Sequence, residues 1–253
     1  MQLDPKSHFE YLLRFADTNL VLGHRLSEWL GKAPVIEEEL ALANIGLDLI
    51  GQARALYMRA AAIADDGRDE DALVFLRDAH DYRNLLLVEK ENGDFAFTIV
   101  RQLLYSSFAQ PFWEALTASR DPEVAGIASR AAKESAYHVR HAGEWLVRLG
   151  DGTSESHGRA KDALDELWMY TGEMFAMDDI DEAALAAGIG VDASALKPAW
   201  DATIDSVTAQ ATLVRPKDGW MIGGGRDGRH TEHLGHLLAE MQYLQRTYPG
   251  QKW

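Results

Sequence analysis

The sequence has no cysteine among its 253 residues. Disulfides, iron–sulfur clusters, thiolate zinc sites and cysteine nucleophiles are therefore excluded. Positive charge is also scarce, because 25 lysines and arginines face 40 aspartates and glutamates, which gives a formal net charge of −15. This balance disfavours nucleic acid and anionic membrane surfaces as partners, since both are bound through an excess of Lys and Arg.

Long hydrophobic runs are missing as well. The longest uncharged stretch, Gln102–Trp113, contains glutamine, serine and proline, and is too short and too polar to span a bilayer. The N-terminal segment carries charges at Asp4, Lys6, Glu10 and Arg14, which leave no room for the apolar core of a secretory signal. We therefore expect a cytoplasmic protein.

The remaining pattern is helical. The composition is that of an ordinary globular protein, with 47% hydrophobic and 26% charged residues. Proline and glycine gather in short clusters, and no run shows the alternation of a β-strand. The predicted helical segments are 5–30, 36–64, 69–90 with a break near 79–84, 94–119, 121–150, 154–175, 179–187, 194–213 and 231–246.

Helices of about 25 residues span roughly 38 Å and form antiparallel bundles when short connections join them. The sequence therefore predicts an all-α fold, a single long-helix bundle domain over residues 1–253 with additional C-terminal helices. The glycine-rich stretch 220–228 follows no predicted strand and lacks the Lys-Ser/Thr pair of a phosphate-binding loop. We interpret it as a plain surface loop. Five tryptophans are candidates for the core or for an interface, with the core favoured: Trp29, Trp113, Trp145, Trp168 and Trp200.

Long helix bundles can hold two metal ions when helices contribute Glu and Glu-x-x-His. The segment 121–150 lacks the intact motif, because the residue three before His138 is Ser135 and Glu134 lies four before it. His138 and His141 are interpreted as packed, hydrogen-bonded histidines.

The segment 36–64 contains no histidine. Asn44, Asp48 and Gln52 form a polar stripe along it, at the spacing of one helix face. We interpret them as buried or half-buried groups that hydrogen-bond one another, Arg54 or a facing helix, because buried polar groups are nearly always paired.

Three longer stretches resemble a known family. They are NIGLDLIGQAR at 44–54, LLLVEKENGDFA at 85–96, and HTEHLG at 230–235 followed by LAEMQYLQR at 238–246. They are similar to the PaaC subunits of the multicomponent 1,2-phenylacetyl-CoA epoxidase, the ring-oxygenating enzyme of bacterial phenylacetate degradation. The similarity covers about residues 11–253. It implies a ferritin-like fold and a tight complex with a homologous subunit, PaaA, which holds a di-iron site and binds the CoA thioester. It also implies a reductase component that delivers electrons from NADPH, and further small subunits.

The resemblance further implies that the ligand positions of the di-iron subunit are mostly substituted in this chain. Against an Asp-Glu-Ala-Gly-His motif, the chain has Leu49 for the glutamate and Gln52 for the histidine. Against Glu-Glu-x-x-His, it has Ser135 for a glutamate and keeps His138. The substituted ligand positions are Asn19, Leu49, Gln52, Ser106, Ser135 and His138. These changes imply a non-catalytic structural subunit with no cofactor of its own, whose partner holds the di-iron centre.

Two alternatives remain open. The first is an independent metal-binding, ferritin-like oxidoreductase that uses other histidine and carboxylate ligands. The candidate ligands are His230, His233 and His236, with Glu232 and Glu240 nearby; the same imidazoles could instead be caps, surface groups or contacts to a neighbouring chain.

The second alternative is a stand-alone acyl-CoA binding module. The phosphates of CoA need cationic partners, for which the nearest candidates are Arg215, Lys217, Arg226 and Arg229. The scarcity of clustered Lys and Arg speaks against this alternative.

Overall fold

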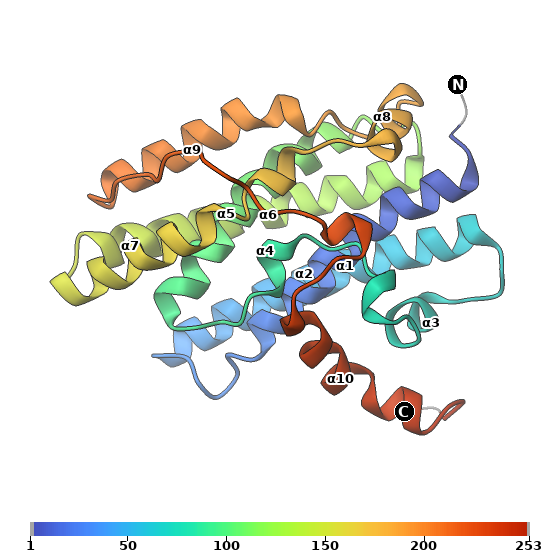
Figure 1. Cartoon of the computed structure of the whole chain (residues 1–253), viewed down its shortest axis with the longest axis horizontal. Helices are drawn as coiled ribbons and strands as arrows, with labels where there is room; N and C mark the ends of the chain where they lie inside the picture. Colours follow the sequence, from blue (N-terminus) through green and yellow to red (C-terminus); the bar gives the residue numbers. More distant parts are fainter. Residues whose placement is uncertain (1–2, 252–253) are drawn as a thin grey trace.

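The computed structural model describes residues 3–251 and has an all-α, ferritin-like architecture (Figure 1). Within these residues no strand occurs. The outermost residues of the predicted domain, 1–2 and 252–253, lie outside the described residues. The helices are α1 (Pro5–Ser27), α2 (Ile36–Ala64), α3 (Glu70–Phe75), α4 (Leu86–Glu89), α5 (Phe95–Leu116), α6 (Pro122–Gly150), α7 (Ser154–Trp168), α8 (Asp179–Ala186), α9 (Lys197–Gln210) and α10 (Glu232–Thr247). Short 3-10 turns lie at Ala79–Asp81, Gly172–Phe175, Ser194–Leu196 and Gly225–Asp227.

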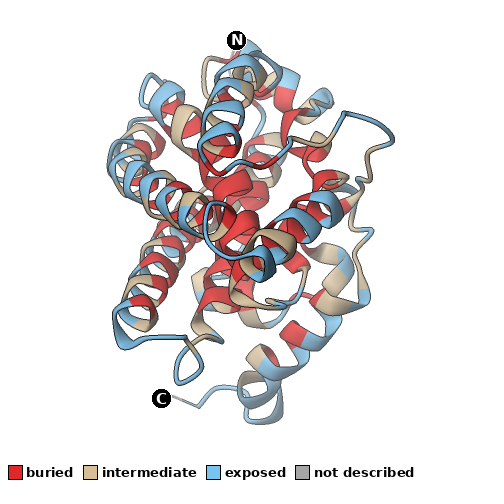
Figure 2. Cartoon of the chain, turned by 90° about the vertical axis from the view of Figure 1, so that its left-hand side faces the viewer, coloured by how far each residue is buried: buried red, intermediate tan, exposed pale blue. Residues whose placement is uncertain are grey.

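Four long helices form the bundle. α1 packs along α2, α5 packs along α6, and α2 contacts α6 between the two pairs. α7 and α9 cover α5 and α6, and α8 lies against α1. The buried residues gather in the middle of this arrangement (Figure 2). α10 packs on α3 and the 3-10 turn after it, away from the bundle (Figure 1).

The sequence explains why these helices form where they do. Buried positions on α6 recur three or four residues apart, as at Ser135, His138 and Ala142, so one face of the helix turns inward. α6 starts at an Asp121 N-cap whose carboxylate accepts from backbone N–H groups, with Pro122 at the first helical position. α5 is buried almost all round, and it continues through Pro111 to Leu116.

The segment predicted as a helix over 69–90 is different in the structure. Only α3 and the single turn of α4 are helical there. The stretch between them is held by side chains instead: Arg77 donates to the Asp17 carboxylate of α1, and the backbone N–H of Arg83 donates to Asp17 Oδ2 at 2.8 Å. Bonds to a distant helix thus replace the local hydrogen bonds of a helix.

The tryptophans belong to the core, as predicted. Trp113, Trp168 and Trp200 are buried, and Trp29 and Trp145 are half-buried and pack against the same core. None of the helices within residues 3–251 is long and apolar enough to cross a membrane.

Candidate functional site

A chain of hydrogen bonds crosses the centre of the bundle and joins all four long helices. The hydroxyl of Tyr105 on α5 donates to Oδ1 of Asn19 on α1. Asn19 Nδ2 donates to Oε1 of Gln52 on α2 at 3.0 Å. Gln52 Nε2 in turn donates to Oε2 of Glu134 on α6 at 2.8 Å. We call Tyr105, Asn19, Gln52 and Glu134 the polar chain.

The polar chain has a definite direction. Burial raises the pKa of Tyr105, so its hydroxyl keeps its proton and acts as the donor. This donor occupies the amide oxygen of Asn19 and leaves the amide nitrogen to face Gln52. Asn19 and Gln52 are both 0% exposed, and each finds two hydrogen-bond partners inside the protein. The series ends on the carboxylate of Glu134, which is half-buried and reaches solvent.

The other substituted ligand positions lie on the same helices. His138 is buried, and its Nε2 lies 3.0 Å from Oδ2 of Asp48 on α2. Ser135 is buried next to Glu134, and Leu49 is buried next to Asp48. Ser106 on α5 is buried and directs its hydroxyl to a carbonyl of its own helix, that of Leu103, at 3.5 Å. The structure thus connects Asn19 to Gln52 directly, and links α2 to α6 both through Gln52 and through His138.

This set of side chains does not fit a pair of iron ions. A di-iron centre in a helix bundle is held by inward-pointing glutamates and histidines, whose negative charge balances the metals. Leu49 has no donor atom, and the amides and hydroxyls at Asn19, Gln52 and Ser135 are neutral. His138 is the one strong ligand among the six positions, and it is already hydrogen-bonded to Asp48.

The polar stripe on α2 is partly as predicted. Asp48 and Gln52 bind the facing helices, which confirms that part of the interpretation. Asn44 is exposed, so its predicted burial is wrong. Arg54 is also not a partner of the stripe, because its guanidinium lies against Glu70 at 3.3 Å. His141, as predicted, is hydrogen-bonded, with its Nε2 2.9 Å from Oε2 of Glu38.

The three histidines at 230, 233 and 236 do not converge. His230 precedes α10 and is nearly buried; its Nδ1 is hydrogen-bonded to the carboxylate of Glu89, and its Nε2 lies 2.9 Å from the carbonyl of Tyr82. Both partners are acceptors, so both ring nitrogens carry protons and His230 is an imidazolium. His233 is half-buried beside Glu91, and His236 is exposed.

The protonation of His230 follows from its surroundings. Burial lowers its pKa, but the hydrogen bond and the charge of Glu89 outweigh burial, so the pKa of His230 is raised. An imidazolium has no free lone pair for a metal. The expectation that these histidines could share an ion is therefore not supported.

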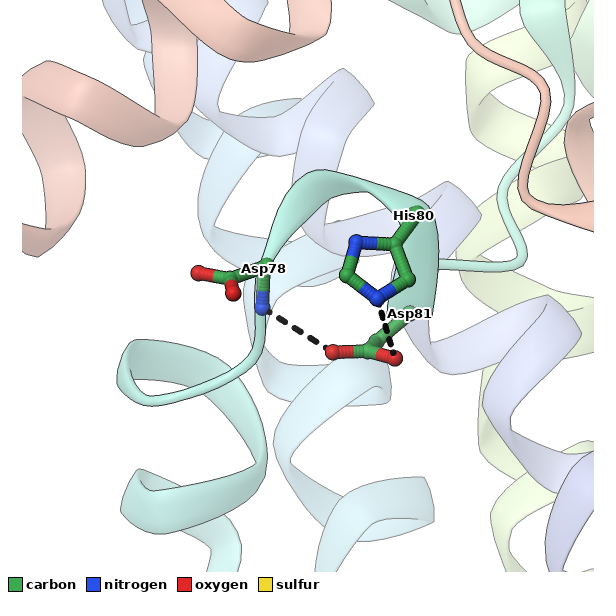
Figure 3. A group of neighbouring side chains, drawn as sticks. All are labelled: Asp78, His80 and Asp81. Carbon is green, nitrogen blue, oxygen red and sulfur yellow. Dashed lines mark hydrogen bonds and ion pairs between the residues drawn. The ribbon is translucent and has the colours of Figure 1, made fainter.

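One group of three histidine and aspartate side chains within residues 3–251 has ligand atoms within 4.8 Å of one another: Asp78, His80 and Asp81 (Figure 3). Asp78 and His80 are exposed, and the Asp81 carboxylate accepts from the backbone N–H of Asp78 at 3.2 Å. The group is therefore explained as the cap of a 3-10 turn.

The glycine-rich loop is more than the surface loop that the sequence predicts. The N–H groups of Gly224 and Gly225 donate to Oε1 of Glu173 at 2.9 and 2.8 Å. A Cβ on Gly225 would lie 2.1 Å from the carbonyl oxygen of Asn84, so the loop passes close to another part of the backbone. A carboxylate of the protein takes the donors that a phosphate would need, which confirms that the loop is not a phosphate-binding loop.

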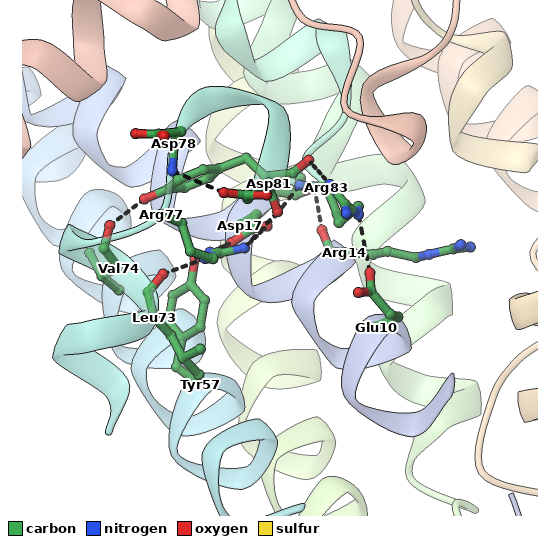
Figure 4. Close-up of polar contacts among 12 residues, drawn as sticks. Glu10, Arg14, Asp17, Tyr57, Leu73, Val74, Arg77, Asp78, Asp81 and Arg83 are labelled. Carbon is green, nitrogen blue, oxygen red and sulfur yellow. Dashed lines mark hydrogen bonds and ion pairs between the residues drawn. The ribbon is translucent and has the colours of Figure 1, made fainter. Parts of the chain in front are cut away.

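Sequence reasoning missed the buried ion pairs of α1. Asp17 is 0% exposed and accepts from Arg77 and from the hydroxyl of Tyr57 (Figure 4). Arg14 is also buried and pairs with Asp178 at 2.6 Å and Asp181 at 2.7 Å. The available signal was that these charges lie among apolar residues on a helix of which most positions are buried.

The arginines considered for CoA binding are also paired within the chain. Arg215 contacts Asp201 at 2.6 Å and Arg226 contacts Asp181 at 2.9 Å. Arg229 pairs with the nearby Asp227. None of these three arginines is therefore left without a carboxylate.

Comparison with known proteins points to one family. The sequence profile of a family described as phenylacetic acid catabolic protein matches residues 2–253. The chain is also 49% identical, over 243 residues, to the PaaC-type subunit of the 1,2-phenylacetyl-CoA epoxidase of Escherichia coli (strain K12). That alignment covers 96% of this chain and 98% of the relative.

Proposed function

Since the chain belongs to the phenylacetic acid catabolic protein family, we propose that it is a non-catalytic, structural subunit of a 1,2-phenylacetyl-CoA epoxidase. In this proposal the chain supports a homologous PaaA-type subunit, which holds the di-iron centre and the acyl-CoA. A reductase and further components complete the assembly, which works in the cytoplasm. Nucleic acid and membrane surfaces are not partners, in keeping with the net charge of −15.

The polar chain is the observation that carries the proposal. At positions where a catalytic relative would hold iron, Asn19 and Gln52 bind each other and extend the contact to Tyr105 and Glu134. Hydrogen bonds between neutral amides join the helices without metal and without unpaired buried charge. A subunit that serves as a scaffold needs this packing and no donor set for iron.

The test is a metal and activity analysis of the chain with and without its partner. The chain is expressed alone, and separately together with the PaaA-type subunit of the same organism, in iron-supplemented medium. We expect less than a tenth of an iron per isolated chain, and iron in the co-purified complex in proportion to the partner. Turnover of phenylacetyl-CoA with oxygen and reductase is expected only from the complex.

A His138→Gln variant makes the test sharper, because His138 is the one conventional iron ligand among the six positions. We expect the complex with this variant to keep its iron content and its turnover per complex. Two irons in each isolated wild-type chain, or loss of iron from the His138→Gln complex, would refute a non-catalytic role.

A further inference from the structure

A row of apolar side chains on α2 points to solvent. Ile36, Leu40, Leu47 and Met58 are between 51% and 70% exposed. At 100° per residue their positions fall within about 40° of one another around the helix, so they form one narrow stripe. With Gly51, which lies on the same side, they define what we call the α2 outer stripe, about 33 Å long at 1.5 Å per residue.

Such a stripe is unusual for a helix on the surface of a bundle. α2 buries its opposite face through Leu42, Leu49 and Leu56, and a surface helix normally presents polar residues outward. A long exposed apolar strip is typical of a surface that another protein covers. Because its side chains are mostly accessible to solvent, no segment of the described chain covers the strip.

Gly51 is a second and independent observation. It lies in the middle of α2 and is exposed, and a Cβ placed on it would have no atom within 4 Å. Gly46 on the same helix differs, because its Cβ would lie 3.2 Å from the carbonyl oxygen of Gly23. Glycine within a helix costs about 1 kcal/mol relative to alanine. Nothing inside the described chain explains that cost at Gly51, whereas the close approach of a second backbone does.

A groove lies beside Gly51. It runs between α2 and α6, has a volume of about 390 Å³, and is lined by Leu47, Gly51 and Met58 of the stripe together with Arg130 and Glu134 of α6. Glu134 is the outer end of the polar chain. A side chain inserted into this groove would therefore contact the residue through which the centre of the bundle reaches solvent.

We propose that the α2 outer stripe is the surface on which a long helix of the PaaA-type subunit docks, with its backbone closest to this chain at Gly51. The inference rests on the proposed function and names the face through which it acts. Taking α2 with α6 about 10 Å beside it, the face measures roughly 33 by 20 Å. This is about 660 Å², close to the ~800 Å² that each partner buries in a stable interface.

The charges around the stripe describe the occupant. Glu37 is exposed at the start of α2, whereas Arg54 and Arg130 lie near its other half. A fitting helix is apolar in the middle, basic opposite Glu37 and acidic opposite the two arginines. The contacts of Arg54 to Glu70 at 3.3 Å and of Arg130 to Glu134 at 3.6 Å are exposed, so these arginines can exchange partners at low cost.

A second copy of this chain fits the stripe less well. If two antiparallel α2 helices crossed at Gly51, residues equally far before and after it would meet. Glu37 would then face Asp65, and Ile36 would face Asp66. Like charges would approach at both ends, and an apolar residue would cover a carboxylate. The pattern is therefore complementary to a different chain.

The test begins with Leu47→Glu in the full-length chain, co-expressed with the PaaA-type subunit. The matched control is Leu76→Glu, because Leu76 is 60% exposed and lies at the end of α3, off the stripe. We expect Leu47→Glu to raise the dissociation constant of the complex at least tenfold, measured by sizing and by titration. Leu76→Glu is expected to leave it unchanged. Circular dichroism and thermal unfolding of the isolated chains should not distinguish either variant from wild type.

Gly51→Ala provides a test in which stability and association move in opposite directions. The added methyl group stabilises α2, so the isolated chain should unfold at a higher temperature. The same group separates the two backbones, so association should weaken. Gly126→Ala is the control, since Gly126 is an exposed glycine of α6 with equally open space around its Cβ. It should stabilise the chain without weakening association.

The outcomes separate this inference from the proposed function. If wild type binds the PaaA-type subunit and both Leu47→Glu and Gly51→Ala bind it equally well, the docking surface is refuted and the function stands. If the wild-type chain alone is a dimer that Leu47→Glu dissociates, the stripe binds a second copy and the inference is wrong. If wild type binds no epoxidase subunit, the proposed function itself fails.

Discussion

Replacing Gln52 by leucine removes the middle of the polar chain and tests whether that chain holds the bundle together. Two hydrogen bonds are lost, one from Asn19 at 3.0 Å and one to Glu134 at 2.8 Å. The first loss leaves the Asn19 amide nitrogen buried without an acceptor, which costs about 1–3 kcal/mol. The second costs less than about 1 kcal/mol, because the Glu134 carboxylate is half-buried and water can replace the amide.

Leucine has a similar volume and recovers part of this cost through apolar burial. We therefore expect Gln52→Leu to lower the free energy of unfolding by about 1–3 kcal/mol. For a chain of this length the unfolding temperature should fall by roughly 5 °C. Urea unfolding and calorimetry of the isolated chain measure both quantities. Asn44→Leu is the control on the same helix, because Asn44 is exposed and its replacement should stay within about 0.5 kcal/mol of wild type.

A double-mutant cycle then separates the bond from the two side chains. Asn19→Leu and Gln52→Leu together should cost less than the sum of the single variants, by about 1 kcal/mol, because the double variant leaves neither amide facing an apolar group. A Gln52→Leu protein as stable as the Asn44→Leu control, or strictly additive single effects, would show that the polar chain does not stabilise the bundle.

Three further predictions concern the surrounding structure. Arg77→Met leaves Asp17 buried without its cation and should cost about 3–5 kcal/mol in urea unfolding, whereas a milder loss would show that water reaches the carboxylate. Because the pKa of His230 is raised in the folded state, its ion pair stabilises the protein fully below about pH 6.5 and loses this effect as the pH rises through the folded pKa. The difference in unfolding temperature between wild type and His230→Gln should therefore shrink from pH 6 to pH 9, and a constant difference would contradict the assignment. Gly225→Ala should destabilise the chain through the 2.1 Å backbone clash, whereas Gly219→Ala, with open space around its Cβ, should not; equal unfolding temperatures would refute the clash.

The long helices could be predicted from the sequence almost to the residue. The expected segment 36–64 is α2 itself, and the expected 121–150 differs from α6 only by its capping residue. Helical period, N-caps and stop signals are local properties, so the chain shows them without knowledge of its neighbours. The expected segment 154–175 was too long, because α7 ends at Trp168 and a separate 3-10 turn follows.

Prediction was poorest where the backbone is held by distant side chains. Between Phe75 and Leu86 no regular helix of more than three residues forms. There Arg77 binds Asp17, a residue of α1 that is 60 positions away in the chain. No local pattern reports such a contact, because its stability comes from the burial that the whole fold provides.

For the candidate site, the sequence by itself determined which donor atoms are available. A leucine at position 49 and amides or hydroxyls at Asn19, Gln52 and Ser135 are facts of composition, and no packing changes them. The absence of cysteine and the helical period are of the same kind. These features depend only on residue type and on spacing along one helix.

Only the tertiary structure decided how those atoms are used. Folding brings Asn19 to Gln52, separated by 33 positions, and Gln52 to Glu134, separated by 82. Folding also pairs His230 with Glu89 and so separates it from the neighbouring histidines that the sequence suggested as co-ligands. Hydrogen bonds need atoms within about 3 Å, and for residues far apart in the chain only the packing of whole helices sets that distance.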